Sequence, residues 1–227
     1  RLMDPSRGAV RVNGVDLRDL DIDPLREQIG FVPQTAYLFS GTIASTVSGV
    51  DEPDQEQRAR VLRALEATAA TEFVEALDEG IDSRVDPGGK NFSGGQRQRL
   101  TMARALYRDA QLYVFDDSFS ALDYTTDAQI RNSLRRYVGS ASILVVAQRV
   151  ATIRHADQTL VLEDGKIVGR GTHTELLETC PTYQKIVASQ EQEGPRGQED
   201  LAGVGPVGPA PTEPPENSGP TGKGADK

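Results

Sequence analysis

The sequence is poor in several residue types, and each shortage limits what the protein can be. Its 227 residues include one cysteine, two histidines and no tryptophan. Because Cys180 has no second cysteine to pair with, an intrachain disulfide is excluded, which favours a reducing compartment. Neither histidine has a partner at metal-ligand spacing, so we interpret His155 and His173 as ordinary loop or cap residues. No run approaches the roughly 18 apolar residues that predict a membrane-spanning helix.

Basic residues are also scarce relative to acidic ones. The net charge is −9, of which −5 belongs to residues 1–189 and −4 to residues 190–227. Domains that bind nucleic acid carry basic patches, so a mildly acidic domain argues against a nucleic-acid partner. The charge does not argue against a small phosphate ligand, which a few local groups can hold.

The last part of the chain has a composition of its own. Residues 190–227 contain many glycines, no aromatic residue and seven prolines: Pro195, Pro206, Pro209, Pro211, Pro214, Pro215 and Pro220. Such a segment cannot bury enough apolar surface to order itself. We therefore divide the chain into a domain, residues 1–189, and a disordered Pro/Gly-rich tail, residues 190–227.

Strand signals recur along the domain. Alternating apolar and polar residues predict two hairpins, one around Asn13-Gly14 and one around Asp164-Gly165. Short apolar runs predict buried strands at 29–33 (IGFVP), 112–116 (LYVFD) and 142–147 (SILVVA). The last two runs are typical of central members of a parallel sheet.

Apolar residues at helical spacing fill the segments between these strands. They predict one or two helices over 54–78, helices within 92–107, at 125–138 and at 173–178, and a single helical turn within 151–157. Strands that alternate with helices imply an α/β fold, with a sheet covered by helices on both faces.

The stretch FSGGQRQRL, residues 92–100, begins with a small-residue turn and continues as a helix. A glycine-rich turn before a helix is common and needs no functional explanation. The alternative is a phosphate clamp, because the Ser93 hydroxyl can donate, the N–H groups of Gly94 and Gly95 are unshielded, and the helix N-terminus adds positive potential. An apolar strand ending in Asp-Asp follows downstream, and this combination is specific enough to favour the clamp.

Five segments, taken in order, resemble motifs of the nucleotide-binding domain of ABC transporters. They are similar to the family's Q-loop, signature motif, Walker B strand, D-loop and switch region, in this order: VPQ (32–34), FSGGQ (92–96), LYVFDD (112–117), SALD (120–123) and VAQRVATI (146–153). Chance agreement of five motifs in the right order is negligible.

Two further segments resemble the exporter branch of that family. LFSGTI (38–43) follows the Q-loop, and SRVDPGGKNFSGGQ (83–96) contains Val85 to Gly89, the stretch in which exporters touch their coupling helices. The resemblance covers residues 1 to about 189. It implies an α/β ABC-type P-loop ATPase domain, with a parallel sheet core and a helical signature subdomain at about residues 40–108.

The resemblance implies ATP as the nucleotide and a head-to-tail dimer, in which each ATP lies between one chain's P-loop and the other chain's signature. The predicted nucleotide-binding residues are Ser93, Gly94, Gly95, Gln96 and, across the dimer interface, Asp123. Taken alone, Asp123 is an N-cap for the helix that follows, and both roles can hold. A transmembrane domain fused upstream would place this domain at the cytoplasmic face of the cell membrane.

Asp116 and Gln34 occupy positions that the family uses for Mg²⁺. Asp116 ends an apolar strand at the carboxyl edge of the sheet, where doubly wound folds bind ligands. The resemblance implies that Asp116 supports Mg²⁺ through water, although such an Asp can also simply cap the next turn. Gln34 would reach Mg²⁺ or the attacking water and report the nucleotide state to the membrane domain. The predicted catalytic residues are Asp117, Gln148 and Gln34.

One motif of the family is missing. Phosphate cradling needs G-x-x-x-x-G-K-[ST], and no such string occurs: Gly165-Lys166 is followed by Ile167, and Gly222-Lys223 by Gly224. In the family this loop lies on the order of ten residues upstream of the segment that matches RLMDP. We therefore expect the chain to be truncated at its N-terminus, and the fragment alone to be inactive.

Asp117 and Gln148 depart from the family's usual residues. Most members have a Glu that polarises the attacking water and a His that contacts the γ-phosphate. Asp is shorter than Glu by one C–C bond, about 1.5 Å, and a displacement of about 1 Å can cost about a hundredfold in rate. Gln148 can hydrogen-bond to phosphate but carries no positive charge. Together the two residues predict a site that binds ATP and hydrolyses it poorly.

The signature FSGGQ, in contrast, is intact. This combination predicts the hydrolysis-impaired half of a heterodimeric exporter, whose signature completes a competent site on a second ABC exporter subunit bearing Glu and His. The alternatives are a homodimeric exporter that turns over slowly, a soluble non-transporting ABC ATPase, and a non-catalytic interaction module.

Overall fold

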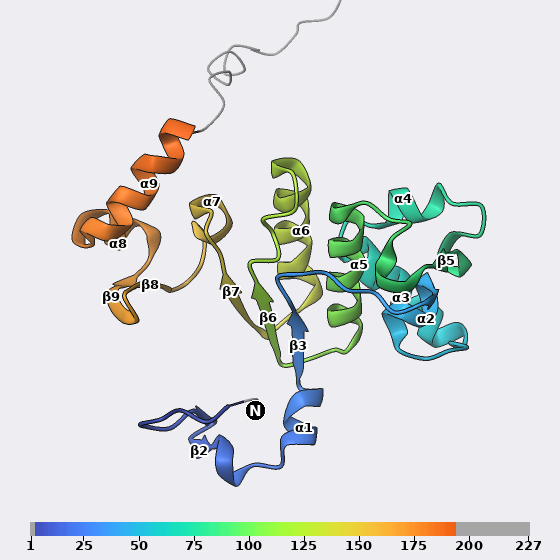
Figure 1. Cartoon of the computed structure of the whole chain (residues 1–227), viewed down its shortest axis with the longest axis horizontal. Helices are drawn as coiled ribbons and strands as arrows, with labels where there is room; N and C mark the ends of the chain where they lie inside the picture. Colours follow the sequence, from blue (N-terminus) through green and yellow to red (C-terminus); the bar gives the residue numbers. More distant parts are fainter. Residues whose placement is uncertain (1–2, 194–227) are drawn as a thin grey trace, which may run out of the picture.

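A three-stranded parallel sheet lies at the centre of the structure (Figure 1). The computed structural model of the chain describes residues 3–193, with the backbone alone for residues 191–193. Strand β6 (Leu112–Asp116) pairs in parallel with β3 (Ile29–Val32) on one side and with β7 (Ser142–Val146) on the other. The predicted strands are present, but only β6 is central: within the described residues, β7 lies at an edge of this sheet.

Helices cover one face of the sheet and build the main core. Val32, Tyr113 and Phe115 point to this face and are buried, together with residues of α5 (Gly94–Tyr107) and α6 (Tyr124–Tyr137). A glycine is required at position 30, because a Cβ atom there would lie 2.5 Å from the Tyr113 ring. The same Cβ would lie 3.0 Å from the Ala105 carbonyl of α5, so the close approach of β3 to both neighbours depends on Gly30.

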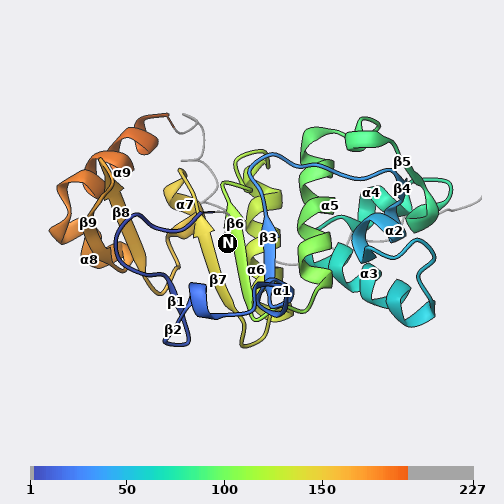
Figure 2. The same ribbon diagram turned by 60° about the horizontal axis from the view of Figure 1, so that its bottom comes forward.

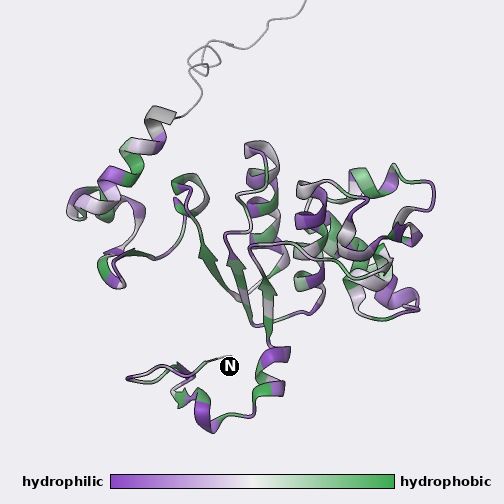
Figure 3. Cartoon of the chain, viewed as in Figure 1, coloured by the Kyte–Doolittle hydropathy of each residue, from purple (hydrophilic) through white to green (hydrophobic). Residues whose placement is uncertain are grey.

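The opposite face of the sheet is open in the described part of the chain. Phe31, Val114 and Leu144 lie in one row across the three strands, and Val146 follows on the same side. Phe31 and Leu144 are each 53% exposed and Val146 is 51% exposed. The strands are strongly apolar in Figure 3. We expected helices on both faces, and residues 3–193 supply them on one.

A helical region lies on the β3 side of the sheet. It packs α2 (Ile43–Ser48), α3 (Gln55–Ala67) and α4 (Thr71–Glu75) around α5, with a short pair of strands, β4 (Gly41–Thr42) and β5 (Arg84–Val85). The predicted helical segment 54–78 thus forms two helices. Two short 3₁₀ turns, Gly80–Asp82 and Pro87–Gly89, connect them to α5.

The N-terminal segment forms the first predicted hairpin. Strands β1 (Arg11–Val12) and β2 (Val15–Asp16) pair antiparallel around Asn13 and Gly14, both of which have positive φ. A 3₁₀ turn, Leu17–Asp19, and helix α1 (Ile22–Glu27) then lead into β3. Asp16 and Asp21 cap these two elements with their side chains.

A C-terminal unit lies on the β7 side of the sheet (Figures 1 and 2). After α7 (Val150–Ile153), the second predicted hairpin forms from β8 (Thr159–Glu163) and β9 (Lys166–Gly171), followed by α8 (His173–Thr179) and α9 (Pro181–Glu193). The unit has its own small core: Val150, Val161, Leu176, Cys180 and Tyr183.

Two details of this unit bear on the sequence predictions. His173 begins α8 and its Nδ1 lies 2.9 Å from the Tyr183 hydroxyl, so it has a structural partner. Helix α9 continues to Glu193, past the predicted start of the tail at Gln190, while residues 194–227 lie outside the described residues. Within residues 3–193, no helix combines the length and the apolarity needed to cross a bilayer.

Candidate functional site

The three predicted catalytic residues follow the three strands of the parallel sheet. Gln34 lies two residues after β3, Asp117 directly after β6, and Gln148 two residues after β7. Carboxyl ends of parallel strands lie at one edge of the sheet, which is where doubly wound folds bind ligands. The parallel topology therefore brings together residues that are 83 and 31 positions apart in the sequence.

Asp117 is the meeting point of these three side chains. Nε2 of Gln34 donates to Oδ2 of Asp117 at 3.3 Å, and Nε2 of Gln148 donates to the same oxygen at 3.1 Å. Both donors are neutral amides, so no cation partners this carboxylate through these bonds. The sequence predicted that the three residues share one site, and the structure places them in direct contact.

The backbone of Asp117 has an uncommon conformation. Its φ is +44°, in the left-handed region that Asp and Asn tolerate better than other non-glycine residues. Its N–H donates to the carbonyl of Val146 at 2.9 Å, and its carbonyl accepts from the Ser120 hydroxyl at 2.7 Å. These bonds aim the carboxylate between the ends of β3 and β7.

Ser118 ties two strand ends together and was not predicted as part of the site. Its side chain is buried, and its hydroxyl lies 3.1 Å from the carbonyl of Val32 and 3.3 Å from that of Asp116. The signal for it was a small polar residue directly after the Asp-Asp pair that ends an apolar strand.

Asp116 and Gln34 are the predicted Mg²⁺ residues. Asp116 is the last residue of β6 and is partly buried, while Gln34 is exposed on the loop after β3. In the part of the chain that the structure describes, no group of three or more His, Cys, Asp or Glu could hold a metal ion. The side-chain oxygens of Asp116 and Gln34 are too few to enclose a metal ion. They suit Mg²⁺, which keeps several waters and takes one or two protein ligands.

The second part of the predicted site is the start of α5. Ser93 is the N-cap, and it forms a reciprocal capping box with Gln96: the Gln96 N–H donates to Ser93 Oγ at 3.3 Å, and the Ser93 N–H donates to Gln96 Oε1 at 2.9 Å. Gly94 and Gly95 are the first two helical residues, so their N–H groups have no acceptor within the helix. Ser93 and Gly94 are exposed.

The two glycines of this turn are not required by the fold. A Cβ at Gly94 would meet nothing within 4 Å, and one at Gly95 would lie 3.7 Å from the Ala121 carbonyl, an ordinary contact. Neither residue has a positive φ. Glycine in a helix costs about 1 kcal/mol relative to alanine, so this chain alone gives no physical reason for the pair. Close approach by an external group is such a reason.

Asp123 caps α6, as predicted. Its Oδ1 accepts from the Thr126 N–H at 2.9 Å and its Oδ2 from the Thr126 hydroxyl at 2.7 Å. These hydrogen bonds hold the pKa of the Asp123 carboxyl below its usual value. The cap is confirmed, and the role of Asp123 across a dimer interface stays a prediction.

Arg149 joins the switch loop to the loop that precedes α6, and sequence reasoning missed it. Its guanidinium donates to the carbonyls of Ser120 and Leu122, each at 3.0 Å, and lies 5.1 Å from the centre of the Tyr124 ring. The signal was its position directly after Gln148. The D-loop and the switch loop are therefore one connected surface.

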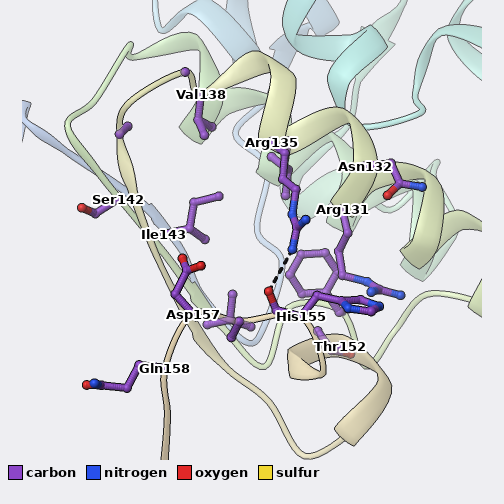
Figure 4. Close-up of a pocket in the computed structure, with 16 residues that line it drawn as sticks. Arg131, Asn132, Arg135, Val138, Ser142, Ile143, Thr152, His155, Asp157 and Gln158 are labelled. Atoms are coloured by element: carbon purple, nitrogen blue, oxygen red, sulfur yellow. Dashed lines mark hydrogen bonds between the residues drawn. The ribbon is translucent and has the colours of Figure 1, made fainter. Parts of the chain in front are cut away.

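A groove of about 760 Å³ lies beside the free edge of β7 (Figure 4). It is lined by α6, by β7 and by the segment 155–158, and Arg135 donates to the His155 carbonyl across it at 2.9 Å. None of the predicted catalytic or nucleotide-binding residues lines this groove. It is therefore separate from the predicted site.

Comparison with known proteins identifies the family to which this domain is similar. Residues 1–120 match the family described as ABC transporter. The chain is 50% identical, over 84% of its length, to an uncharacterized ABC transporter ATP-binding protein of Mycobacterium tuberculosis (strain ATCC 25618 / H37Rv), and covers 32% of that protein. It is 42% identical to an ATP-dependent lipid A-core flippase of Ralstonia nicotianae (strain ATCC BAA-1114 / GMI1000), over 81% of this chain and 31% of that protein.

A solved structure gives the same result for the fold. The chain resembles a bacterial Atm1-family ABC exporter with ATP bound, with a TM-score of 0.77 and 32% identity, over 82% of this chain and 33% of that one. This match and the parallel sheet confirm the predicted fold class, an α/β ABC-type ATPase domain. The chain spans about a third of the length of the relatives it matches.

Proposed function

Because this chain belongs to the ABC transporter family, we propose that it is the ATP-binding part of an exporter subunit. In this proposal it couples ATP binding and hydrolysis to export of a substrate, at the cytoplasmic face of the membrane and beneath a transmembrane domain fused upstream. The names of a lipid A-core flippase and of an Atm1-family exporter among its relatives support the exporter branch.

The start of α5 fits the terminal phosphate of an ATP held by a second subunit. The Ser93 hydroxyl and the N–H groups of Gly94 and Gly95 lie at a helix N-terminus, where anions are favoured, and Ser93 and Gly94 are exposed. The open space beside Gly94 leaves room for a phosphate. When bound, ATP with Mg²⁺ supplies the transferable phosphoryl group. This chain contributes donors that hold and orient that group, with Gln96 fixing the turn through its capping box.

The Asp117 cluster supports a slow site of its own. A carboxylate that orients water for hydrolysis must reach the water, and Asp117 instead accepts from two amides on one oxygen. Its side chain is about 1.5 Å shorter than a Glu. Gln148 brings no positive charge toward a phosphate. This paired use of Asp117 by Gln34 and Gln148 is the observation on which the proposal of impaired hydrolysis rests.

We place this chain in a head-to-tail heterodimer. An intact signature at α5 and an impaired carboxylate at β6 are opposite properties in one chain. They are compatible when the signature serves the nucleotide bound by the partner subunit, which bears the Glu and the His. ATP at this chain's own Walker B strand would then bind and turn over slowly.

The open face of the sheet supports the proposal that a longer protein supplies the missing P-loop. Parallel sheets are covered on both faces, and burying one Phe, Leu or Val side chain contributes about 1.5–3 kcal/mol. Phe31, Leu144 and Val146 are about half exposed. Strands β7 and β8 are not paired with each other, and the groove of Figure 4 lies beside β7. We propose that an upstream strand enters between β7 and β8, followed by a helix over the open face.

The test of function uses the full-length protein. We expect it to bind ATP but hydrolyse it slowly when reconstituted alone in lipid vesicles. Adding a partner subunit with Glu and His should raise hydrolysis at least about tenfold, since water orientation contributes roughly 10²–10⁴-fold. Substantial hydrolysis without a partner would favour the homodimeric exporter. Full-length protein that binds no ATP would favour a non-catalytic interaction module. An upstream sequence without membrane spans would favour the soluble ATPase.

Residues 1–227 alone provide a second test. The chain lacks the P-loop nest and lysine that hold phosphates, and its signature acts only across a dimer. We expect no appreciable binding of a fluorescent ATP analogue to this fragment. Low-micromolar binding would contradict both the missing P-loop and the trans role of α5.

A further inference from the structure

Helix α9 carries an apolar stripe that ends in a polar residue. Tyr183, Ile186 and Val187 pack into the C-terminal core, with Tyr183 fully buried. Residues spaced by three, four and seven positions share one helix face, so Gln190 lies on the same face as this stripe. Gln190 is half-buried. A glutamine where the periodicity calls for an apolar side chain needs polar partners.

The partners of Gln190 are backbone groups of the switch loop. Its Nε2 donates to the carbonyl of Gln148 at 2.6 Å, and the N–H of Val150 donates to its Oε1 at 2.8 Å. One side-chain amide thus bonds both a carbonyl and an N–H, two residues apart. Only Asn and Gln offer a donor and an acceptor in one amide.

Three consecutive residues of the switch loop are anchored by three different parts of the molecule. Gln148 is held at its side chain by Asp117 and at its carbonyl by Gln190. Arg149 is held by the carbonyls of the loop before α6. Val150 is buried in the C-terminal core and bonded to Gln190. The carbonyl of Gln148 is the point at which α9 acts on the residue proposed to contact phosphate.

We propose that Gln190 is a positioning residue, which sets the orientation of Gln148 through the backbone of the switch loop. The proposal rests on the proposed function for the role of Gln148, but not for the contact itself. Without Gln190, the carbonyl of Gln148 and the N–H of Val150 lose their partners and the intervening peptides are free to turn. Because a shift of about 1 Å can cost about a hundredfold in rate, helix α9 influences the hydrolytic site without touching the nucleotide.

Hydrogen exchange measures the contact directly. In the full-length transporter, Gln190→Ala should speed exchange at the Val150 amide by roughly 5–30-fold, the change that follows from losing hydrogen bonds of this kind. Overlapping peptides that isolate residues 149–151 provide the readout by mass spectrometry. Unchanged exchange at these residues would overturn the proposal.

Gln184 provides a matched control on the same helix. Its Nε2 donates to the carbonyl of Leu177 at 2.6 Å. Gln184→Ala therefore removes a hydrogen bond of the same kind and the same length, but one that does not involve the switch loop. We expect no change at residues 149–151 in this variant. An equal rise in exchange at residues 149–151 in both variants would mean that any loosening of α9 produces the effect. That result would overturn a specific role for Gln190.

The kcat for ATP hydrolysis is a measurement that loss of a purely structural contact would not change. The background is the transporter with Asp117→Glu and Gln148→His in this chain and the partner's catalytic Glu disabled, so that hydrolysis comes from this site. There, Gln190→Ala should lower kcat about tenfold or more and leave KM for ATP nearly unchanged, while Gln184→Ala changes neither. Equal kcat with and without Gln190 would overturn the proposal.

If Gln190→Ala loosens the whole of α9, the variant Gln190→Glu still tests the positioning role of Gln190. Glutamate keeps the length and the acceptor for the Val150 N–H, but when ionised it cannot donate to the Gln148 carbonyl. We expect Val150 to stay protected while kcat falls in the background described above. Wild-type kcat in this variant would overturn the proposal. Absence of any hydrolysis in that background would count against the proposed function alone, because the exchange result at residues 149–151 does not depend on it.

Discussion

The start of α5 and the Asp117 cluster are the two halves of the predicted site, and they are built in opposite ways. At α5, Ser93 and Gln96 satisfy each other, while two glycines that the fold does not need are the first helical residues, whose N–H groups have no acceptor within the helix. At the strand ends, Asp117 takes a left-handed backbone conformation and its carboxylate is occupied by Gln34 and Gln148.

This difference indicates where each half acts. Groups that face outward without an internal partner are suited to a ligand brought by another molecule. Groups that satisfy one another within the chain must first be displaced before they can serve a ligand. The comparison is consistent with the proposal that α5 serves a nucleotide held by a partner, while the Asp117 cluster belongs to the slower site of this chain.

The largest expected effect comes from breaking the α5 half. Ser93→Asp keeps a good N-cap, but it places a negative charge where the partner's γ-phosphate would lie. Steady-state ATPase activity of the assembled transporter should fall at least about a hundredfold, the cost of losing a preorganised donor. Thermal melting should be nearly unchanged, because the cap is kept. Ser93→Arg and Gly95→Asp should abolish turnover in the same way, and near-normal activity in all three would remove the trans role.

The next prediction separates the two nucleotide sites. Replacing the catalytic Glu of the partner subunit should remove nearly all ATPase activity, whereas Asp117→Ala in this chain should remove little. Single-turnover measurements on both variants test the asymmetry. If Asp117→Ala stops turnover as fully as loss of the partner's Glu, the two sites are equivalent and the slow homodimeric exporter replaces the heterodimer.

A smaller, positive effect should come from restoring the Asp117 half. With the partner's Glu disabled, Asp117→Glu combined with Gln148→His should produce measurable hydrolysis, because the longer carboxylate reaches the water and the imidazole contacts phosphate. The gain should exceed that of either single change, since groups acting in one transition state are not additive. Equal activity in the double and single variants would argue against a shared transition state.

The smallest effect is expected at the C-terminus, and there the structure sharpens the prediction from sequence. Deleting residues 194–227 should leave transport and ATPase activity largely intact, because a Pro/Gly-rich composition without aromatic residues predicts little burial of apolar surface. Deleting from Gln190 instead also removes the bonds to Gln148 and Val150. We expect the longer deletion to lower hydrolysis further than the shorter one when this site supplies the activity, that is, with Asp117→Glu and Gln148→His in this chain and the partner's Glu disabled. Equal loss in both would mean that the tail itself has a role.

The order of elements followed from local patterns in the sequence. Apolar runs placed β3, β6 and β7, turn residues placed the two hairpins, and helical spacing placed α3 to α6. These signals are local, so a single sequence carries them. The open face was not expected, because helix-covered parallel sheets are the rule and the pattern of Phe31 and Leu144 looks the same whether a neighbour is present or not.

Sequence motifs selected the residues of the candidate site but missed Ser118 and Arg149, and they did not predict its geometry. The motifs around Gln34, Asp117 and Gln148 carried the resemblance, although Asp117 and Gln148 themselves depart from the family's usual Glu and His. The convergence of the three residues followed from a parallel sheet. The sharing of one oxygen, and the positive φ of Asp117, depend on the relative placement of three loops. Gln190 was assigned to the tail because composition changes there. The heptad spacing from Tyr183 was the signal that could have placed it on α9.

The free edge of β7 has a consequence for handling the protein. An exposed edge strand with apolar side chains is a template for pairing with another chain, and Leu144 and Val146 provide such an edge here. Residues 1–227 produced alone should therefore self-associate as their concentration rises, through strand addition at β7.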